Sequence, residues 1–96
     1  MSVVYLVTFK AKDEAFDKFR DFLKKILPDT AAYPGAEFIS CAENAEDKSF
    51  LLYEVWDSAE SQASYIAWRG ESGDAEAIGS MLREAPEFKP LNHVPF

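Results

Sequence analysis

The sequence predicts an α+β domain of the ferredoxin-like type, with a split β-α-β pattern, a four-stranded antiparallel sheet and helices on one sheet face. Three observations support this fold class. The 96 residues fit one domain, residues 1–96. Strand-like and helix-like periodicities follow the order β-α-β-β-α-α-β. The strands are apolar on both faces, which is typical of a sheet covered on both sides.

The first strand is expected over residues 3–10, which are mostly β-branched or aromatic and end at a charged residue. These residues occupy both the odd and the even positions, so both faces of the strand are apolar. A helix should follow, with Asp13 as its N-cap. Its apolar residues recur at helical spacing over 16–27. Pro28 lacks an N–H, so it should end or kink this helix, or else start a further turn that reaches Ala32.

A hairpin is expected in the middle of the chain. The Tyr-Pro-Gly segment at 33–35 is a turn signal, and residues 37–43 form the next strand. A polar connection at 44–48 has hairpin length and leads into the strongest strand, 50–56. Alternation within that strand puts Phe50, Leu52, Glu54 and Trp56 on one face.

Two further helices are expected after this strand. Asp57 or Ser58 should cap the first of them. The Gly-Glu-Ser-Gly segment at 70–73 should interrupt it. A third helix should open at Asp74, keep an apolar face as far as Ala85 and stop before Pro86.

The last strand is expected over residues 88–94. Pro90 and Pro95 remove two backbone donors, so this strand belongs at a sheet edge or a bulge. Helices cover only one face of a ferredoxin-like sheet, and the apolar second face therefore needs another cover. We expect a second copy of the chain to supply it, which makes the protein a homodimer.

Charge and composition exclude several classes of partner. Seventeen acidic against ten basic residues give a net charge of −7. Nucleic acid requires clustered Lys and Arg, and the longest basic run is Lys24-Lys25, so no nucleic-acid partner is expected. The same acidity disfavours binding of the protein to an anionic membrane surface. The N-terminal apolar run lacks a basic leader and is too short to span a bilayer, so we expect a cytoplasmic protein.

The sequence has few residues suited to metal binding or to nucleophilic catalysis. His93 is the only histidine and Cys41 the only cysteine, so no metal site of clustered ligands and no internal disulfide is predicted. Cys41 lies within a strand without a neighbouring base and is expected to be a small core residue. The two glycines of 70–73 have neither a preceding strand nor a following Lys, which excludes a phosphate loop.

Aromatic residues gather where the third strand meets the second helix. They are Tyr53, Trp56, Tyr65 and Trp68, with Arg69 beside the last. Such rings suit a pocket for a flat apolar substrate, in which Arg69 would hold a phenolate or carboxylate. Tyr65 or His93 would exchange a proton with a substrate hydroxyl. Alternatively, the rings fill the core and the dimer interface, Arg69 makes an ordinary ion pair, and His93 lies on the surface.

The chain resembles the antibiotic biosynthesis monooxygenase family over nearly its whole length. The matching segments are Thr30-Ala-Ala-Tyr-Pro-Gly35, Tyr53-Glu-Val-Trp56 and the helix start Asp57-Ser-Ala-Glu60. This family includes quinol monooxygenases and has a dimeric ferredoxin-like α/β-barrel fold. The resemblance implies oxidation of a phenolic, anthrone or hydroquinone substrate by dioxygen, with no metal, flavin or haem cofactor. It also implies that Trp56 lines the substrate pocket.

The chain departs from the family pattern at two places. Members commonly carry a histidine nine residues after this tryptophan, where Tyr65 stands, and often a second one within the next turn, where this chain reads Ala67-Trp-Arg-Gly70. The related haem-degrading branch needs an axial histidine on this helix, so haem is not expected. Two alternatives to an oxygenase remain open: a small-molecule binding or sensing module without turnover, and an isomerase of the same fold.

Overall fold

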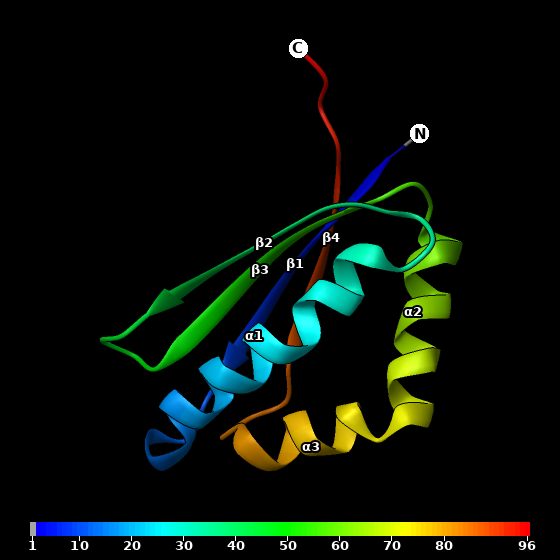
Figure 1. Cartoon of the computed structure of the whole chain (residues 1–96). Coiled ribbons are helices and arrows are strands. Elements are labelled where there is room, and N and C mark those ends of the chain that lie inside the picture. Colours follow the sequence, from blue (N-terminus) through cyan, green and yellow to red (C-terminus); the bar gives the residue numbers. More distant parts are fainter. Residues whose placement is uncertain (1) are drawn as a thin grey trace.

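The computed structural model describes residues 2–96 as a four-stranded antiparallel sheet with helices on one face (Figure 1). In chain order the elements are β1 (Val3–Lys10), the 3₁₀ turn η1 (Asp13–Ala15), α1 (Phe16–Ala32), β2 (Ala36–Asn44), β3 (Ser49–Trp56), α2 (Ala59–Ser72), α3 (Asp74–Met81) and β4 (Glu87–Asn92). The strand order β2-β3-β1-β4 confirms the predicted α+β ferredoxin-like fold.

The register of the sheet decides which side chains meet beneath the helices. β1 lies between β3 and β4, so that Val7 faces Leu52 on one side and Phe88 on the other. Glu54 is paired with Tyr5 on β1 and with Ile39 on β2. Because side chains alternate along a strand, all of these residues project toward the helices.

Aromatic rings from α1 and the two central strands fill the core. Phe19 is fully buried and meets the rings of Phe9 and Phe50 edge to face, with centroids 5.3 Å apart in both pairs. Phe16 stacks at a tilt on Phe50, at 4.9 Å. Edge and tilted contacts are the arrangements that aromatic quadrupoles favour. They hold α1 against the sheet.

The start of α1 differs from the prediction. Asp13 lies in η1, and α1 begins at Phe16 without a side-chain cap, so the expected Asp13 N-cap is wrong. Pro28 lies inside α1, which continues to Ala32, the second of the two outcomes left open. A proline there removes the hydrogen bond to the Lys24 carbonyl. Both residues are on the exposed side of the helix, where water can replace that bond.

The caps of α2 are well defined. Ser58 is its N-cap, and its Oγ accepts a hydrogen bond from the Ser61 N–H at 3.1 Å. α2 ends at Ser72, and its C-cap Gly73, with a left-handed φ of 84°, separates it from α3, so the interruption expected within residues 70–73 is confirmed at its last residue. α3 ends at Met81, four residues before the predicted end at Ala85.

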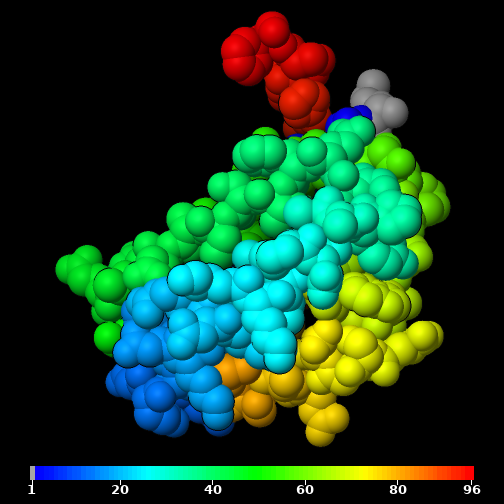
Figure 2. Space-filling view, viewed as in Figure 1, coloured from blue at the N-terminus to red at the C-terminus, as the bar shows by residue number. Residues whose placement is uncertain are grey.

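The C-terminal strand is an edge strand, as its prolines predicted. β4 pairs only with β1 and ends at Asn92, two residues short of the predicted end. Residues 93–96 then extend beyond the body of the molecule (Figure 2). On the sheet face without helices, Phe38, Tyr53 and Leu91 are exposed. No helix within residues 2–96 has the length and apolarity needed to cross a bilayer.

Candidate functional site

A cavity of about 210 Å³ lies between the helix-facing side of the sheet and the three helices. Its wall is almost entirely apolar and draws on every element except η1 and β2. The lining residues are Val7, Phe9, Leu23, Ile26, Leu27, Leu52, Glu54, Tyr65, Ile66, Arg69, Ala75, Ile78, Pro86 and Phe88. Ile66 and Phe88 are exposed to solvent as well as lining the cavity, so they mark its opening.

Glu54 is the acidic group of this cavity. The residue is 97% buried, because β3 turns it toward the helices between Leu52 and Trp56. Its Oε1 accepts a hydrogen bond from Trp56 Nε1 at 3.0 Å. Among residues 2–96, no group donates to Oε2. Burial raises the pKa of the Glu54 carboxyl, and the bond from Trp56 opposes that rise.

Trp56 belongs to an aromatic cluster beside the cavity. It is fully buried, and its ring lies 5.2 Å from that of Tyr65. Tyr33 joins them from the end of α1, with its ring 5.4 Å from Tyr65 and 5.4 Å from Trp68. The Arg69 guanidinium lies over the Trp68 ring at 4.7 Å, within cation–π range. The predicted gathering of Trp56, Tyr65, Trp68 and Arg69 is thus present in the structure.

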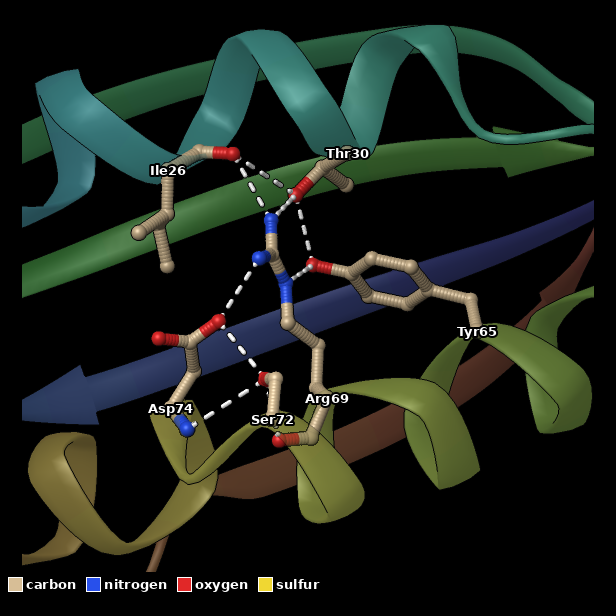
Figure 3. Close-up of polar contacts among 6 residues, drawn as sticks. All are labelled: Ile26, Thr30, Tyr65, Arg69, Ser72 and Asp74. Atoms are coloured by element: carbon tan, nitrogen blue, oxygen red, sulfur yellow. Dashed lines mark hydrogen bonds and ion pairs between the residues drawn. The ribbon is translucent and has the colours of Figure 1, made fainter.

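Arg69 connects α2 to α1 through a buried network (Figure 3). Its Nε donates to the Tyr65 hydroxyl at 2.8 Å. One terminal nitrogen donates to the Ile26 carbonyl at 2.7 Å and to Thr30 Oγ1 at 2.9 Å. The other donates to Asp74 Oδ2 at the start of α3, also at 2.9 Å. An arginine that is 95% buried is tolerated here because donors on all three of its side-chain nitrogens have acceptors.

The Tyr65 hydroxyl is engaged on two sides. It accepts from Arg69 and lies 2.5 Å from Thr30 Oγ1. Thr30 is fully buried and also lies 3.4 Å from the Ile26 carbonyl. A consistent arrangement has Tyr65 donating to Thr30 and Thr30 donating to Ile26. Tyr65 and Arg69 therefore position the helices and line the cavity at the same time.

Of the predicted site residues, Tyr65 and Arg69 line the cavity, Trp56 and Trp68 lie beside it in the aromatic cluster, and Tyr53 and His93 lie elsewhere. Tyr53 was grouped with Trp56, but it points to the opposite sheet face and contacts Phe38, with ring centroids 6.2 Å apart. That grouping is wrong because strand positions an odd number of residues apart, here three, lie on opposite faces, and the substrate contact proposed for Tyr53 stays a prediction. His93 lies in the exposed segment after β4 and does not line this cavity. Its role in proton exchange also stays a prediction.

Glu54 and Thr30 are members of the site that the sequence reasoning missed. The signal for Glu54 was present, since it shares a strand face with the apolar Phe50, Leu52 and Trp56. An acidic side chain on such a buried face is rare unless it is paired or hydrogen-bonded. Thr30 carries no comparable signal. Its position in α1, one turn after Ile26, acquires meaning only when Arg69 reaches it from α2.

Cys41 also differs from its expectation. It lies on the edge strand β2 and is exposed instead of buried in the core. Partial burial of its thiol still raises its pKa, and the nearby Glu43 adds to that rise. A raised pKa disfavours the thiolate form, so a nucleophilic role has no support here. Among residues 2–96, no three His, Cys, Asp or Glu side chains come together as metal ligands.

Solved structures from several organisms have the same fold. A conserved protein from Methanosarcina mazei is 14% identical, with 96% of this chain and 92% of that chain covered and a TM-score of 0.84. Rv0793 from Mycobacterium tuberculosis is 18% identical, with 100% and 98% covered and a TM-score of 0.78. A monooxygenase from the gene ActVA-Orf6 of Streptomyces coelicolor, solved with the ligand nanaomycin D, is 16% identical, with 99% and 89% covered and a TM-score of 0.78.

These identities show a shared fold and leave the activity open. A search of curated proteins finds no significant match. The sequence profile described as antibiotic biosynthesis monooxygenase matches residues 2–79. That match extends from β1 through α2 into α3 and includes Glu54, Trp56, Tyr65 and Arg69. The chain belongs to the antibiotic biosynthesis monooxygenase family.

Proposed function

We propose that this protein is a cofactor-independent monooxygenase that oxidises a small phenol or quinol with dioxygen. The observation that carries the proposal is the cavity between sheet and helices, with an apolar wall and three polar groups, on Glu54, Tyr65 and Arg69. An apolar cavity with few, convergent polar groups is the usual form of a small-molecule site. Membership of the monooxygenase family supports the reaction type.

The cavity size supports a small substrate. An engineered apolar cavity of about 150 Å³ holds benzene, and this cavity has about 210 Å³. One or two fused rings would fill it, whereas larger polycyclic phenols would require Ile66 and Phe88 to move at the opening. We therefore expect the best substrates among monocyclic and bicyclic phenols and quinols.

The reaction balances without another reactant. A phenol with a hydrogen at the para carbon loses its hydroxyl proton, and the resulting phenolate reduces dioxygen as a C–O bond forms at that carbon. Loss of the C–H proton and cleavage of the O–O bond then give a quinone and one water. Both protons end in the water. A dry cavity that holds the substrate in one orientation favours C–O bond formation between the phenolate and dioxygen.

The roles proposed for Tyr65 and for the two tryptophans beside the cavity follow from their positions. Tyr65 would release its hydroxyl proton from the bond to Thr30 to the departing oxygen when the O–O bond breaks, while the donor on Arg69, 2.8 Å away, stabilises the tyrosinate, and the proton lost from the substrate carbon would restore the hydroxyl. Trp56 holds the adjacent wall and Glu54 in place. Trp68, whose ring is partly exposed next to Arg69, would contact substituents that extend from the cavity.

Oxygen consumption tests the proposal. Metal-stripped protein is mixed with monocyclic and bicyclic hydroquinones, phenols and anthrones, and dissolved oxygen is followed after correction for autoxidation. We expect uptake that saturates with substrate and is proportional to protein concentration. Uptake at the autoxidation rate for the whole panel would contradict the proposal.

A binding or sensing module is the second candidate, and one observation favours it. Donors on all three Arg69 nitrogens and the Tyr65 hydroxyl are already bonded within the protein, which leaves fewer polar groups for chemistry. Such a module would show a ligand-dependent rise in melting temperature without oxygen uptake. The same screen therefore separates the two candidates. An isomerase would consume its substrate at constant oxygen.

We also propose that the working form is a homodimer joined through the helix-free sheet face. That face carries Phe38 and Leu91, 56% and 39% exposed, around the buried Val4. Phe38, Tyr53 and Leu91 make an apolar surface spanning three of the four strands, and exposed surfaces of this kind mark association sites. Light scattering should give a mass near twice 10.8 kDa, and Phe38→Lys should shift it to the monomer. A monomeric wild type at micromolar concentration would contradict this proposal.

A further inference from the structure

We propose that Glu54 binds the hydroxyl group of the substrate and accepts its proton through the carboxylate oxygen that Trp56 does not hold. This inference rests on the proposed function and adds to it a catalytic residue and the functional group that the substrate must carry. The substrate class is thereby narrowed to compounds with a free aromatic hydroxyl. O-methylated analogues, which lack the O–H donor, are excluded.

The first argument is the orientation of the carboxylate. Trp56 Nε1 fixes Oε1 at 3.0 Å, and Trp56 itself is fully buried between the rings of Tyr33 and Tyr65. Oε2 has no donor within residues 2–96, although the residue is 97% buried and lines the cavity. Every fully enclosed side-chain polar atom of these residues has a partner, so Oε2, which has none, keeps some accessible surface, and the cavity is the space that Glu54 lines. A ligand hydroxyl there would supply the donor that an acceptor in an apolar wall lacks.

The second argument is the contrast with the other polar groups of the cavity. Arg69 donates from all three nitrogens to protein acceptors, and the Tyr65 hydroxyl is bonded to Arg69 and Thr30. Neither offers an unoccupied acceptor. Glu54 is thus the one lining side chain with an acceptor atom free to take a proton from a ligand. Burial also makes its carboxylate a stronger base than an exposed one.

The proton step balances within the cavity. The substrate O–H bond breaks and its electron pair stays on the substrate oxygen. The proton forms a new O–H bond to Glu54 Oε2, and the negative charge moves from the carboxylate to the aromatic ring. The net charge of the cavity does not change, so the step avoids placing a second charge in an apolar site. The proton returns when the oxygenated product forms and water leaves.

Glu54→Gln is the test variant. The Trp56 N–H needs an acceptor, so the amide oxygen of the introduced glutamine should face Trp56 and its NH₂ group should face the cavity. The variant then presents a donor where the wild type presents an acceptor, at nearly the same volume. Glu46→Gln, in the exposed β2–β3 connection, is the matched control for loss of one carboxylate.

Turnover gives the first readout. With a substrate identified by oxygen uptake, Glu54→Gln should lower kcat by about 100-fold or more, the usual contribution of a positioned base, and Glu46→Gln should leave it unchanged. Wild-type kcat in Glu54→Gln would overturn the inference while leaving the oxygenase proposal in place.

Binding gives a readout that does not depend on turnover. 4-Nitrophenol has an O–H where 4-nitroanisole has an O–CH₃ group, and their affinities are compared by equilibrium dialysis below the pKa of the phenol. The wild type should prefer the phenol by about tenfold or more, as a hydrogen bond to a charged acceptor predicts. Glu54→Gln should lose that preference. Equal preference in both proteins, or none in the wild type, would overturn the inference, even if no substrate is ever oxidised.

Discussion

Trp56 donates its indole N–H to the carboxylate of Glu54, 3.0 Å away, from two positions further along the same strand. Residues two apart on β3 project to the same face, so the pair is fixed by the strand itself. Trp56 is fully buried and Glu54 nearly so, which means that water does not compete for this bond. The indole thus holds one carboxylate oxygen, and the other has no donor among residues 2–96 in a side chain that lines the cavity.

The burial of Glu54 should make stability depend on pH. Its pKa is raised in the folded protein, so its contribution to stability is fully present below the unfolded value of about 4.3 and is lost as pH rises through the folded value. The other titratable side chains facing it within residues 2–96 are Tyr65 and Arg69 of the cavity and Tyr5 across the strand pair.

Urea unfolding at several pH values tests this dependence. The free energy of unfolding should fall with rising pH relative to Glu54→Gln, by up to about 1.4 kcal/mol per pH unit. A parallel pH dependence in both proteins would contradict the assignment to Glu54.

Removing the indole donor should move that pH window. The bond from Trp56 lowers the pKa of Glu54, so Trp56→Phe should raise it further and displace the loss of stability to higher pH. The same variant loses a buried hydrogen bond and becomes less stable by about 1–3 kcal/mol. Unfolding curves at several pH values test both effects. Trp68→Phe, at a partly exposed ring without a bond to Glu54, is the control.

Thr30 should contribute to stability through the network between α1 and α2. Thr30→Val keeps the side-chain shape but removes the acceptor for Arg69 and the partner of Tyr65. We expect a loss of about 1–3 kcal/mol, measured as a fall in the midpoint of thermal unfolding. Thr8→Val is the matched control for the same exchange of hydroxyl for methyl, because Thr8 lies on the opposite sheet face from this network, and its effect should be smaller than that of Thr30→Val. Equal effects of the two substitutions would show that the network adds nothing.

Tyr65→Phe separates a chemical role of the hydroxyl from a structural one. It breaks the same contact with Thr30 as Thr30→Val does, so both variants should lose similar stability. If Tyr65 delivers a proton during turnover, only Tyr65→Phe should lower kcat, by about 100-fold or more. Equal kcat in the two variants, measured as oxygen uptake below their melting temperatures, would remove Tyr65 from the mechanism.

Gly35 is the residue of the α1–β2 turn that cannot be replaced. Its φ is 97°, and a Cβ there would lie 2.5 Å from Ser61 Cβ. Gly35→Ala should therefore cost about 1–3 kcal/mol from backbone strain alone and displace the start of α2. Gly79→Ala in α3, where a Cβ meets nothing within 4 Å, should instead stabilise by about 0.5–1 kcal/mol. Thermal unfolding of both variants decides the matter, and a neutral Gly35→Ala would contradict the close approach.

The sequence alone determined the order of the elements and the fold class. Alternation in residues 3–10 and 50–56, helical spacing in 16–27 and the prolines of the last strand are local patterns, and each predicted its element within a few residues. The errors lie at boundaries. The Asp13 cap and the end of α3 depend on how neighbouring segments pack, which local periodicity does not encode.

Only the tertiary structure decided which contacts the site residues make. Sequence spacing gathered Trp56, Tyr65, Trp68 and Arg69 correctly, since one strand–helix junction places all four. It could not show that Arg69 would extend to Thr30, 39 positions earlier in the chain, or that Glu54 would keep one oxygen free in an apolar cavity. A hydrogen bond depends on angles and distances between elements, and these are fixed when the helices pack on the sheet.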